Sequence, residues 1–305
     1  MTTYARLPSR VFILLWTLIG LGYGPLAAAQ SGRAIDEIAD NSFLIEEAYN
    51  QDPGVVQHIL TAQWGENRDQ HPQQRGWDFA FTQEWPLFSQ RHQFSYTIPF
   101  SFTHQGRDHQ DGVGDIELNY RFQASMENER LPAFAPRFTL ILPTGSRDEG
   151  TGNGVVGYDW NLPFSKKLGS RFAVHANLGL TYLPDVRVPV DTEPGSEGND
   201  DAMQIRHLSP PHSLVSYNLG ASIIFALFPR FHLMLEWIGI FEEDINEQGK
   251  KEHDFNVVIA PGIRTAVVDQ DGLQIVLGVT APVGLTRPAA DHAVFLYCSV
   301  EHNFF

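Results

Sequence analysis

Apolar and polar residues alternate along most of this chain, in segments of roughly ten residues. The segment that begins at Ser95, SYTIPFSFTH, shows the pattern, because Tyr96, Ile98, Phe100 and Phe102 alternate with serine, threonine and proline. Side chains of a β-strand point to opposite faces with a period of two, so each such segment has one apolar and one polar face. A soluble sandwich and a membrane barrel both produce this pattern.

Twelve segments after residue 54 carry the alternation. They lie at 55–64, 76–85, 92–103, 113–123, 134–142, 155–162, 170–182, 214–226, 230–241, 253–265, 271–283 and 292–305. Most reach or exceed the ~9–11 residues that a tilted strand needs to cross a bilayer. Residues 41–54 also resemble a strand in part, but counting them would give thirteen.

The connections between these segments separate the two folds. If the N-terminus is periplasmic, the odd connections face outward, and they are polar stretches such as GENRDQHPQQR and PTGSRDEGTGNG. The even connections, such as PLFSQR, FPR and VVDQD, are generally shorter. Outer-membrane barrels combine short periplasmic turns with longer external loops, and a sandwich has no reason to do so. The sequence therefore predicts an all-β, twelve-stranded antiparallel transmembrane β-barrel of the bacterial outer membrane, whose closure removes unpaired strand edges.

Composition narrows the choice further. Of the 305 residues 43% are apolar, and the mean hydropathy is -0.20, which argues against a helical membrane protein but not against a barrel with polar residues in every strand. A net charge of -15 argues against nucleic acid as a partner. The single cysteine, Cys298, permits no internal disulfide. We therefore expect no cofactor and no structural metal site.

The N-terminus predicts export. Arg6 and Arg10 precede an apolar run at 11–24, and Pro25 and small residues follow, which is the pattern of a signal peptide cleaved before Gln30. The alternative is an uncleaved anchor helix, but the run is shorter than the ~20 residues that span a bilayer. We therefore expect a signal peptide at 1–29, a periplasmic segment at 30–54 that packs at the barrel mouth, and a barrel at 55–305.

If the apolar faces contact lipid, the polar faces line a lumen. Twelve strands lie between the eight whose side chains fill a barrel and the sixteen that leave a channel, which predicts a narrow or partly plugged pore for small solutes. Acidic side chains outnumber basic ones among the candidates, which favours cations or neutral solutes; alternatively, the charges pair across the interior and rigidify it. The lumen-lining candidates are Asp78, Glu84, Asp115, Glu117, Asn119, Arg121, Arg137, Asp159, His175, Asn177, Glu236, Asp254 and Arg264.

Catalytic and metal-binding motifs are weak. His212 and Ser213 are adjacent, but neighbouring residues of an extended chain point apart, so we expect no catalytic dyad and no enzyme. A further group, His104, Asp108, His109 and Asp111, could bind a divalent ion but sits in a solvated loop. Loop acids could share divalent cations with lipopolysaccharide phosphates; these are Glu193, Glu197, Asp200, Asp201, Glu242 and Glu243.

Two stretches suggest a family. In DGVGDIELNYRF, Gly112, Gly114 and Asp115 form a G-x-G-D strand start, and PRFTLILPTG follows with Pro136, Leu140, Pro143, Thr144 and Gly145. This part of the chain resembles the outer-membrane barrels assigned as transporters of the MetA pathway of phenol degradation. The resemblance covers about 45 residues and implies uptake of phenolic or other small aromatic compounds by a Gram-negative cell. It implies no catalytic or binding residues.

The C-terminal Phe305 resembles the terminal aromatic residue that the barrel insertion machinery recognises in outer-membrane proteins. The expected partners are therefore outer-membrane lipid, lipopolysaccharide, that machinery and a small-molecule solute, and we expect a monomer. The expected function is a channel or transporter for small molecules. The alternative is a barrel that does not transport, either a membrane-embedded hydrolase or a structural anchor that presents loops.

Overall fold

The computed structural model describes residues 33–38, 42–67, 74–105, 108–147, 149–191, 206–246, 248–286 and 292–304. The predicted signal peptide and Phe305 lie outside these ranges. The elements are η1 (Ala34–Asp36), β1 (Val55–Asn67), β2 (Gln74–Leu87), β3 (Ser89–Gln105), β4 (Asp108–Val113), β5 (Ile116–Phe122), β6 (Ala133–Phe134), β7 (Arg137–Leu142), β8 (Gly157–Leu168), β9 (Phe172–Val186), β10 (Pro189–Asp191), β11 (Arg206–Leu208), β12 (His212–Phe228), β13 (Phe231–Ile245), β14 (Lys251–Gln270), β15 (Leu273–Thr280), β16 (Val283–Gly284) and β17 (His292–Asn303).

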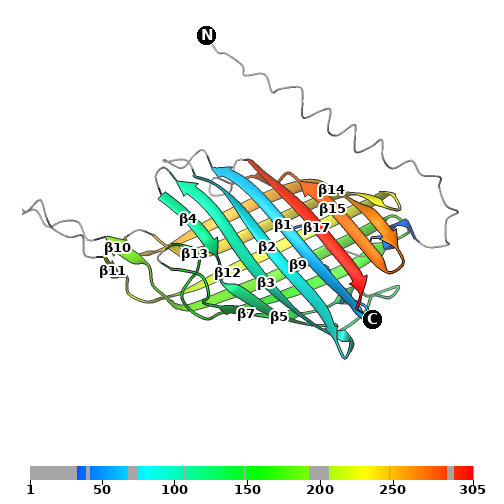
Figure 1. The fold of residues 1–305 in the computed structure, drawn as a ribbon, viewed down its shortest axis with the longest axis horizontal. Helices are drawn as coiled ribbons and strands as arrows, with labels where there is room; N and C mark the ends of the chain where they lie inside the picture. The colour runs from blue at the N-terminus through cyan, green and yellow to red at the C-terminus, as the bar shows by residue number, and fades with distance from the viewer. Residues whose placement is uncertain are drawn as a thin grey trace, which may run out of the picture. The chain divides into compact units, whose positions relative to one another are not determined.

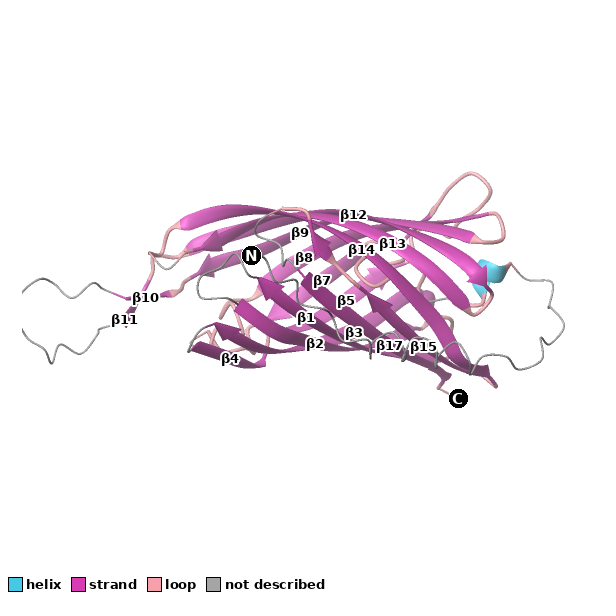
Figure 2. Ribbon diagram, turned by 90° about the horizontal axis from the view of Figure 1, so that it is seen from above, coloured by secondary structure: helices cyan, strands magenta, loops and turns pink. Residues whose placement is uncertain are grey.

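Twelve of these strands form a closed antiparallel barrel (Figures 1 and 2). They pair in the order β1-β2-β3-β5-β7-β8-β9-β12-β13-β14-β15-β17, and β17 pairs back with β1 from Val55 opposite Asn303 to Glu66 opposite His292. The short strands β4, β6 and β16 extend neighbouring strands, while β10 and β11 form a separate two-stranded ribbon. The prediction of a twelve-stranded barrel is confirmed, and each of the twelve predicted segments overlaps one of its strands.

The short connections are tighter than we predicted from the sequence. FSKKLG was expected to connect two strands, but β8 runs through it to Leu168. VVDQD was also expected to be a connection, but β14 continues to Gln270 and turns at Asp271 and Gly272. Both of these residues have positive φ angles, 53° and 76°, as a tight turn of two residues requires. We call this end of the barrel the turn end and the opposite end the loop end.

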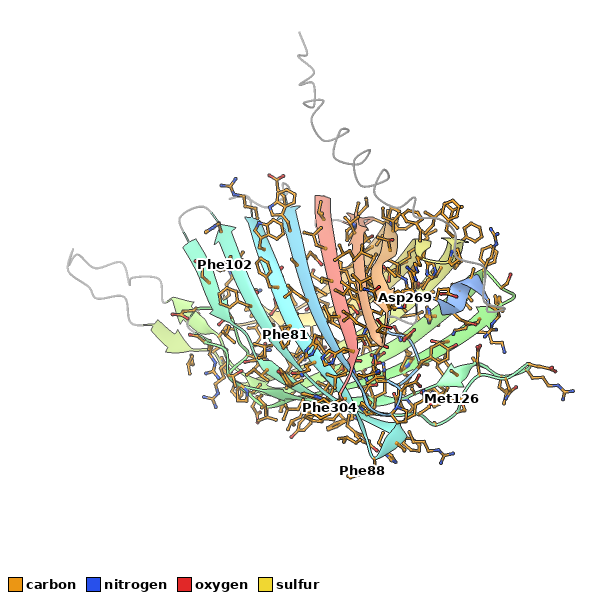
Figure 3. The ribbon with its side chains drawn as sticks, turned by 45° about the vertical axis from the view of Figure 1, so that its right-hand side comes forward. Phe81, Phe88, Phe102, Met126, Asp269 and Phe304 are labelled. Atoms are coloured by element: carbon orange, nitrogen blue, oxygen red, sulfur yellow. The ribbon has the colours of Figure 1, made fainter. Side chains whose placement is uncertain are left out.

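The two faces of the barrel wall have opposite chemistry. Ile223 on the outer face is 51% exposed, whereas Glu236 on the inner face is completely buried. Phe81 and Phe102 lie on the outer wall, and the fully exposed Phe88 lies at a turn (Figure 3). A water-soluble sandwich buries its apolar face, so this inverted distribution is that of a membrane barrel. Other exposed apolar side chains of the strands are Leu60, Trp77, Tyr120, Phe138, Trp160, Leu178, Leu219, Leu235 and Trp237.

Candidate functional site

The lumen is crossed by part of the chain's own N-terminal region. Residues 42–54, which we call the luminal segment, precede β1 and lie among side chains of the inner wall. Phe43, Ile45 and Ala48 of this segment are buried, and so are Ser42 and Asn50. The sequence predicted that residues 30–54 pack at the barrel mouth; the structure places the luminal segment inside the barrel.

Polar side chains of the inner wall bind the backbone of the luminal segment. The Asn177 Oδ1 accepts a hydrogen bond from the Glu46 amide at 2.7 Å, and its Nδ2 donates to the Glu46 carbonyl at 3.0 Å. Gln123 makes the same kind of pair, accepting from the Asn50 amide and donating to the Ala48 carbonyl. Glu236 Oε1 accepts from the amides of residues 44 and 45. Buried backbone groups need such partners, so the wall replaces the strand that would normally satisfy them.

Glu46 is the electrostatic centre of this contact. Its carboxylate lies 2.9 Å from Arg121 Nη1 and 3.1 Å from Arg137 Nη1, and Asn161 Nδ2 donates to it at 2.7 Å. Burial alone would raise the pKa of Glu46, but the two guanidinium groups hold that pKa below its ordinary value. Arg137 also lies 3.3 Å from Asp159, so the luminal segment joins an ion-pair network of the wall.

Arg121 of this cluster also binds a longer stretch of the backbone of the luminal segment. Arg121 donates to the Asn50 side chain at 2.8 Å and to the carbonyls of residues 47 and 49 at 3.1 and 2.7 Å. Its side chain is only 3% exposed. A guanidinium group offers five donors in a fixed plane, and here several of them bind one segment. Arg121 is therefore the wall residue with the most contacts to the luminal segment among those described.

Apolar contacts hold the beginning of the luminal segment. The ring of Phe43 lies 5.9 Å from that of Phe295 and 5.4 Å from that of Tyr297, both on β17. A β-carbon on Gly278 would collide with the Phe43 ring, and one on Gly220 would collide with Ile45. Glycine inside a strand weakens the strand but lets other groups approach closely. These glycines leave space in the wall for the two apolar side chains.

The structure separates the thirteen lumen-lining candidates into groups. All except Asp115 lie in strands, on the face opposite the exposed apolar residues. Four bind the luminal segment: Arg121, Arg137, Asn177 and Glu236. Arg264 binds the carbonyl of Ile38 just before it, and His175, Glu84 and Asn119 contact Ser165, Gln93 and Thr139 of the wall. The acids Asp78, Glu117, Asp159 and Asp254 lie on the same inner face, and Asp159 binds Arg137 there.

Several contributors to the site were missed in the sequence analysis. Gln93, Gln123, Asn161 and Ser165 all bind the luminal segment. Gln93, Asn161 and Ser165 occupy inward positions of strands, so the alternation could have identified them. An uncharged amide side chain is suited to pair with a backbone amide, because it offers both a donor and an acceptor.

The motif residues come together, and they shape a loop. Asp115 accepts hydrogen bonds from the amides of Gly145 at 2.9 Å and Asn153 at 2.8 Å. Thr144 Oγ1 donates to the Gly114 carbonyl at 3.0 Å and accepts from the amide of residue 116. A β-carbon on Gly145 would lie 2.6 Å from a backbone oxygen of the same loop. These contacts attach the loop after β7 to the start of β5, and they involve four of the motif residues, Gly114, Asp115, Thr144 and Gly145, without a ligand. Of the other two, Gly112 lies in β4, and Pro143 follows β7.

The candidate catalytic and metal residues do not form a site among the described residues. His212 Nε2 contacts the carbonyl of Gly249 at 3.1 Å, while Ser213 Oγ accepts from the Tyr182 hydroxyl at 3.4 Å. His104 pairs across the strands with His109, but no group of three His, Cys, Asp or Glu side chains in the described parts of the chain could hold a metal ion. The predicted loop acids between 193 and 201 lie outside the described residues. Glu243 binds Lys251 at 2.7 Å.

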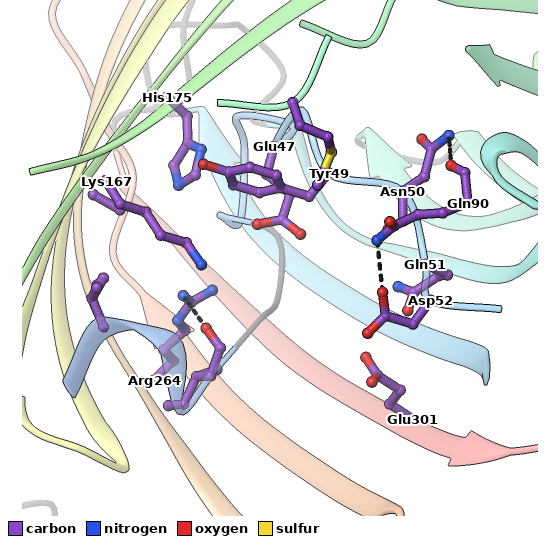
Figure 4. Close-up of a pocket in the computed structure, with 14 residues that line it drawn as sticks. Glu47, Tyr49, Asn50, Gln51, Asp52, Gln90, Lys167, His175, Arg264 and Glu301 are labelled. Carbon is purple, nitrogen blue, oxygen red and sulfur yellow. Dashed lines mark hydrogen bonds between the residues drawn. The ribbon is translucent and has the colours of Figure 1, made fainter. Parts of the chain in front are cut away.

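A cavity open to solvent lies beside the luminal segment, with an empty volume of about 770 Å³. Lys167 and Arg264 line one side of it, and Asp52 and Glu301 the other, with Tyr49 between them (Figure 4). Lys167 also binds Asp36 of η1 at 2.8 Å and lies over the Tyr49 ring. The cavity is thus bounded by η1 and the luminal segment.

Comparison with known proteins supports the fold. No family model matches the chain, and no curated protein matches it in sequence. An outer membrane channel from Pseudomonas putida F1 is similar in structure, with a TM-score of 0.59 at 13% identity over 84% of this chain and 97% of that one. The transport unit of the autotransporter AIDA-I from Escherichia coli has a TM-score of 0.50 at 10% identity over 90% of this chain and 100% of that one. The chain therefore has the fold of outer-membrane β-barrels.

Among the described residues, no helix is long and apolar enough to cross a membrane.

Proposed function

We propose that this protein is an outer-membrane channel for small molecules. The observation that carries the proposal is the inverted wall of the closed barrel, whose exposed side chains are apolar and whose buried side chains are polar, as Ile223 and Glu236 show. A wall of this kind is stable in lipid and offers a hydrophilic path through it. The proposal also includes export by the predicted signal peptide, insertion by the barrel assembly machinery and contact with lipopolysaccharide. We expect a monomer, because a closed barrel leaves no strand edge to pair.

The charges of the lumen favour cationic or neutral solutes. Among the lumen-lining candidates that lie in strands, six are acidic and three are arginines, so the wall keeps an excess of acids when the luminal segment withdraws. Fixed charges in a low-dielectric tube attract ions of opposite sign. The resemblance of residues 111–154 to phenol-degradation transporters supports phenolic or other small aromatic compounds as the solute.

In the proposed channel the luminal segment closes the path, and solutes pass when it withdraws. A disulfide can test both statements. Ser42 Oγ and Ser222 Oγ lie 2.7 Å apart and join the luminal segment to β12. Cysteines at both positions, with Cys298→Ser to remove the native thiol, should form a bond that locks the segment in place.

The measurement is ion conductance across planar bilayers for Ser42→Cys/Ser222→Cys/Cys298→Ser, before and after reduction. The reduced channel should conduct, the oxidised channel should not, and Ser42→Cys/Cys298→Ser should conduct under both conditions. Equal conductance of the oxidised and reduced forms would show that the segment does not close the path. The absence of conductance in every form would favour the alternative, a barrel that does not transport. The filled lumen also supports that alternative.

The solute is tested by liposome swelling with the reduced variant. A phenyl glycoside is a useful probe, because its sugar slows passage through lipid while its ring keeps the aromatic character. We expect liposomes that contain the reduced channel to swell faster in this solute than liposomes that contain the oxidised one. Swelling with glucose alone would support a channel but contradict a preference for aromatic solutes.

A further inference from the structure

The inner wall holds the phenyl ring of Phe43 in a closely fitting slot. Phe295 and Tyr297 contact this ring at centroid distances of 5.9 and 5.4 Å, with ring planes tilted by 41° and 49°. These distances and tilts are typical of favourable contacts between aromatic rings. The slot is thus lined on one side by two aromatic faces of β17.

Two glycines form the other side of the slot. A β-carbon on Gly278 would collide with the Phe43 ring, and one on Gly262 would lie 2.9 Å from it. Both glycines lie at inward-facing positions of neighbouring strands, Gly278 on β15 and Gly262 on β14. These strands pair with Gly262 opposite Thr280. The missing side chains leave a flat surface on which a six-membered ring fits. Ile59 and Val276, both buried, belong to the same apolar cluster, so the slot excludes water.

The slot differs in kind from the other contacts of the luminal segment. Asn177, Gln123 and Glu236 bind backbone groups, which any extended peptide would offer. The slot instead fits a side chain of one shape, a flat uncharged ring. An apolar cavity of aromatic size that is emptied of its side chain stays dry and can bind benzene. Recognition of a free aromatic molecule would therefore need no rearrangement of the wall, only the departure of the Phe43 ring.

We propose that this slot, formed by Phe295, Tyr297, Gly262 and Gly278, is a binding site for small uncharged monocyclic aromatic molecules. Such a molecule replaces the Phe43 ring when the luminal segment withdraws and so holds the lumen open. The inference rests on the proposed function in one respect only, since opening matters for transport if the barrel is a channel. The exchange of rings itself can be measured without transport.

The size of the effect follows from linkage. A ligand that binds only the withdrawn state increases the population of that state by the factor 1 + [L]/Kd. At about ten times its dissociation constant the ligand therefore increases this population by about tenfold. The Phe43 ring is covalently tethered beside the slot, so a free molecule competes with it poorly at low concentration. The docked state therefore persists when the solute is absent.

Thiol labelling reports the withdrawn state directly. Ser42 is only 3% exposed, so a cysteine there, in Ser42→Cys/Cys298→Ser, reacts with a maleimide only when the segment withdraws. The probe ligand is phenol, and the matched control is cyclohexanol, which has a hydroxyl group on a ring that is not aromatic. We expect phenol to accelerate labelling by about tenfold near saturation and cyclohexanol to do so several-fold less.

Two further variants keep the test decisive. Phe295→Leu removes one aromatic face and should weaken the phenol effect, which is measured relative to this variant's own labelling rate without ligand. Phe43→Ala empties the slot, and phenol should then raise the melting temperature more than it does for the parent. Equal effects of phenol and cyclohexanol, or a phenol effect that Phe295→Leu does not change, would overturn the inference. Labelling that responds to phenol in a barrel without conductance would keep the site and reject the channel.

Discussion

At the scale of single residues, Glu46 has the contacts that matter most for closure. It is the luminal-segment side chain that contacts both Arg121 of β5 and Arg137 of β7, and it also accepts a hydrogen bond from Asn161 of β8. Three strands of the wall therefore meet at one carboxylate. Hydrogen bonds to charged groups contribute about 1.5–3 kcal/mol each when they are well formed. Loss of this single charge should weaken docking of the whole segment.

The low pKa of Glu46 makes docking sensitive to pH. Burial acts to raise this pKa, but Arg137 and Arg121 outweigh it, so the pKa in the docked state lies below the ordinary value of 4.5. A group whose pKa is lower in the docked state stabilises docking above its ordinary pKa, and this contribution disappears as the pH falls through the docked-state pKa. We therefore expect labelling of Ser42→Cys/Cys298→Ser, normalised to thiolate reactivity, to increase as the pH falls below about 4.5.

Glu46→Gln is the variant that assigns this pH dependence. Glu117 and Asp159 face the same arginine cluster, so a variant that removes only the Glu46 carboxylate is needed. In the glutamine variant, labelling should already be about tenfold faster at neutral pH and should change less in acid. Glu243→Gln removes a carboxylate that binds Lys251, away from the luminal segment, and should behave like the parent. An unchanged pH profile in Glu46→Gln would contradict the assignment.

At the scale of elements, the luminal segment is held by glycines of the wall as much as by its own residues. Gly278→Ala tests this, because the added methyl group would occupy the place of the Phe43 ring, which is itself confined by Phe295 and Tyr297. Overpacking of a filled site costs about 1–3 kcal/mol. We expect Gly278→Ala to speed Ser42→Cys labelling by about tenfold or more.

The second half of this test is a double-mutant cycle. In a Phe43→Ala background the ring is gone, so Gly278→Ala should have little further effect on labelling. Gly239→Ala provides a matched control, because a β-carbon there would make only an ordinary contact, 3.5 Å from the side chain of Trp237. Additive effects of Gly278→Ala and Phe43→Ala would show that the methyl group acts on the strand and not on the ring.

The strands could be predicted from the sequence, whereas the luminal segment could not. Alternation is a local signal, and in β2, β5, β9, β13 and β14 each strand carries its own pattern, with the polar positions opposite the exposed apolar side chains. The luminal segment carries part of the same alternation, since Phe43 and Ile45 are buried whereas Leu44 and Glu46 are only partly buried. Its partners are distant in sequence: Leu44 binds Glu236, which is 192 residues away. No local pattern records such a contact, although inward-facing glycines in β12, β14 and β15 were a signal that the wall is approached closely there.

At the scale of the whole molecule, the charges of the lumen are arranged by depth. The arginines cluster around the luminal segment, with Glu117 beside Arg137, while Asp78 and Asp254 lie in the parts of β2 and β14 nearest the loop end. A solute that enters from the loop end therefore meets carboxylates before it meets matched ion pairs. Since unmatched charges set the field of a narrow pore, the acids should determine selectivity even though arginines are present.

The reversal potential under a tenfold KCl gradient measures this selectivity. For the open channel, Ser42→Cys/Ser222→Cys/Cys298→Ser after reduction, we expect a potential of the sign given by cation preference, well below the ~59 mV of ideal selectivity for a monovalent ion. The double variant Glu117→Gln/Asp254→Asn should move the reversal potential towards zero. Glu243→Gln changes a residue of the outer face and should leave the potential unchanged. The preference should fade near 1 M salt, where the Debye length falls to about 3 Å and the fixed carboxylates are screened. A potential of the opposite sign would mean that withdrawal of the luminal segment, which removes Glu46 from Arg121 and Arg137, leaves the arginines as the dominant charges of the open pore.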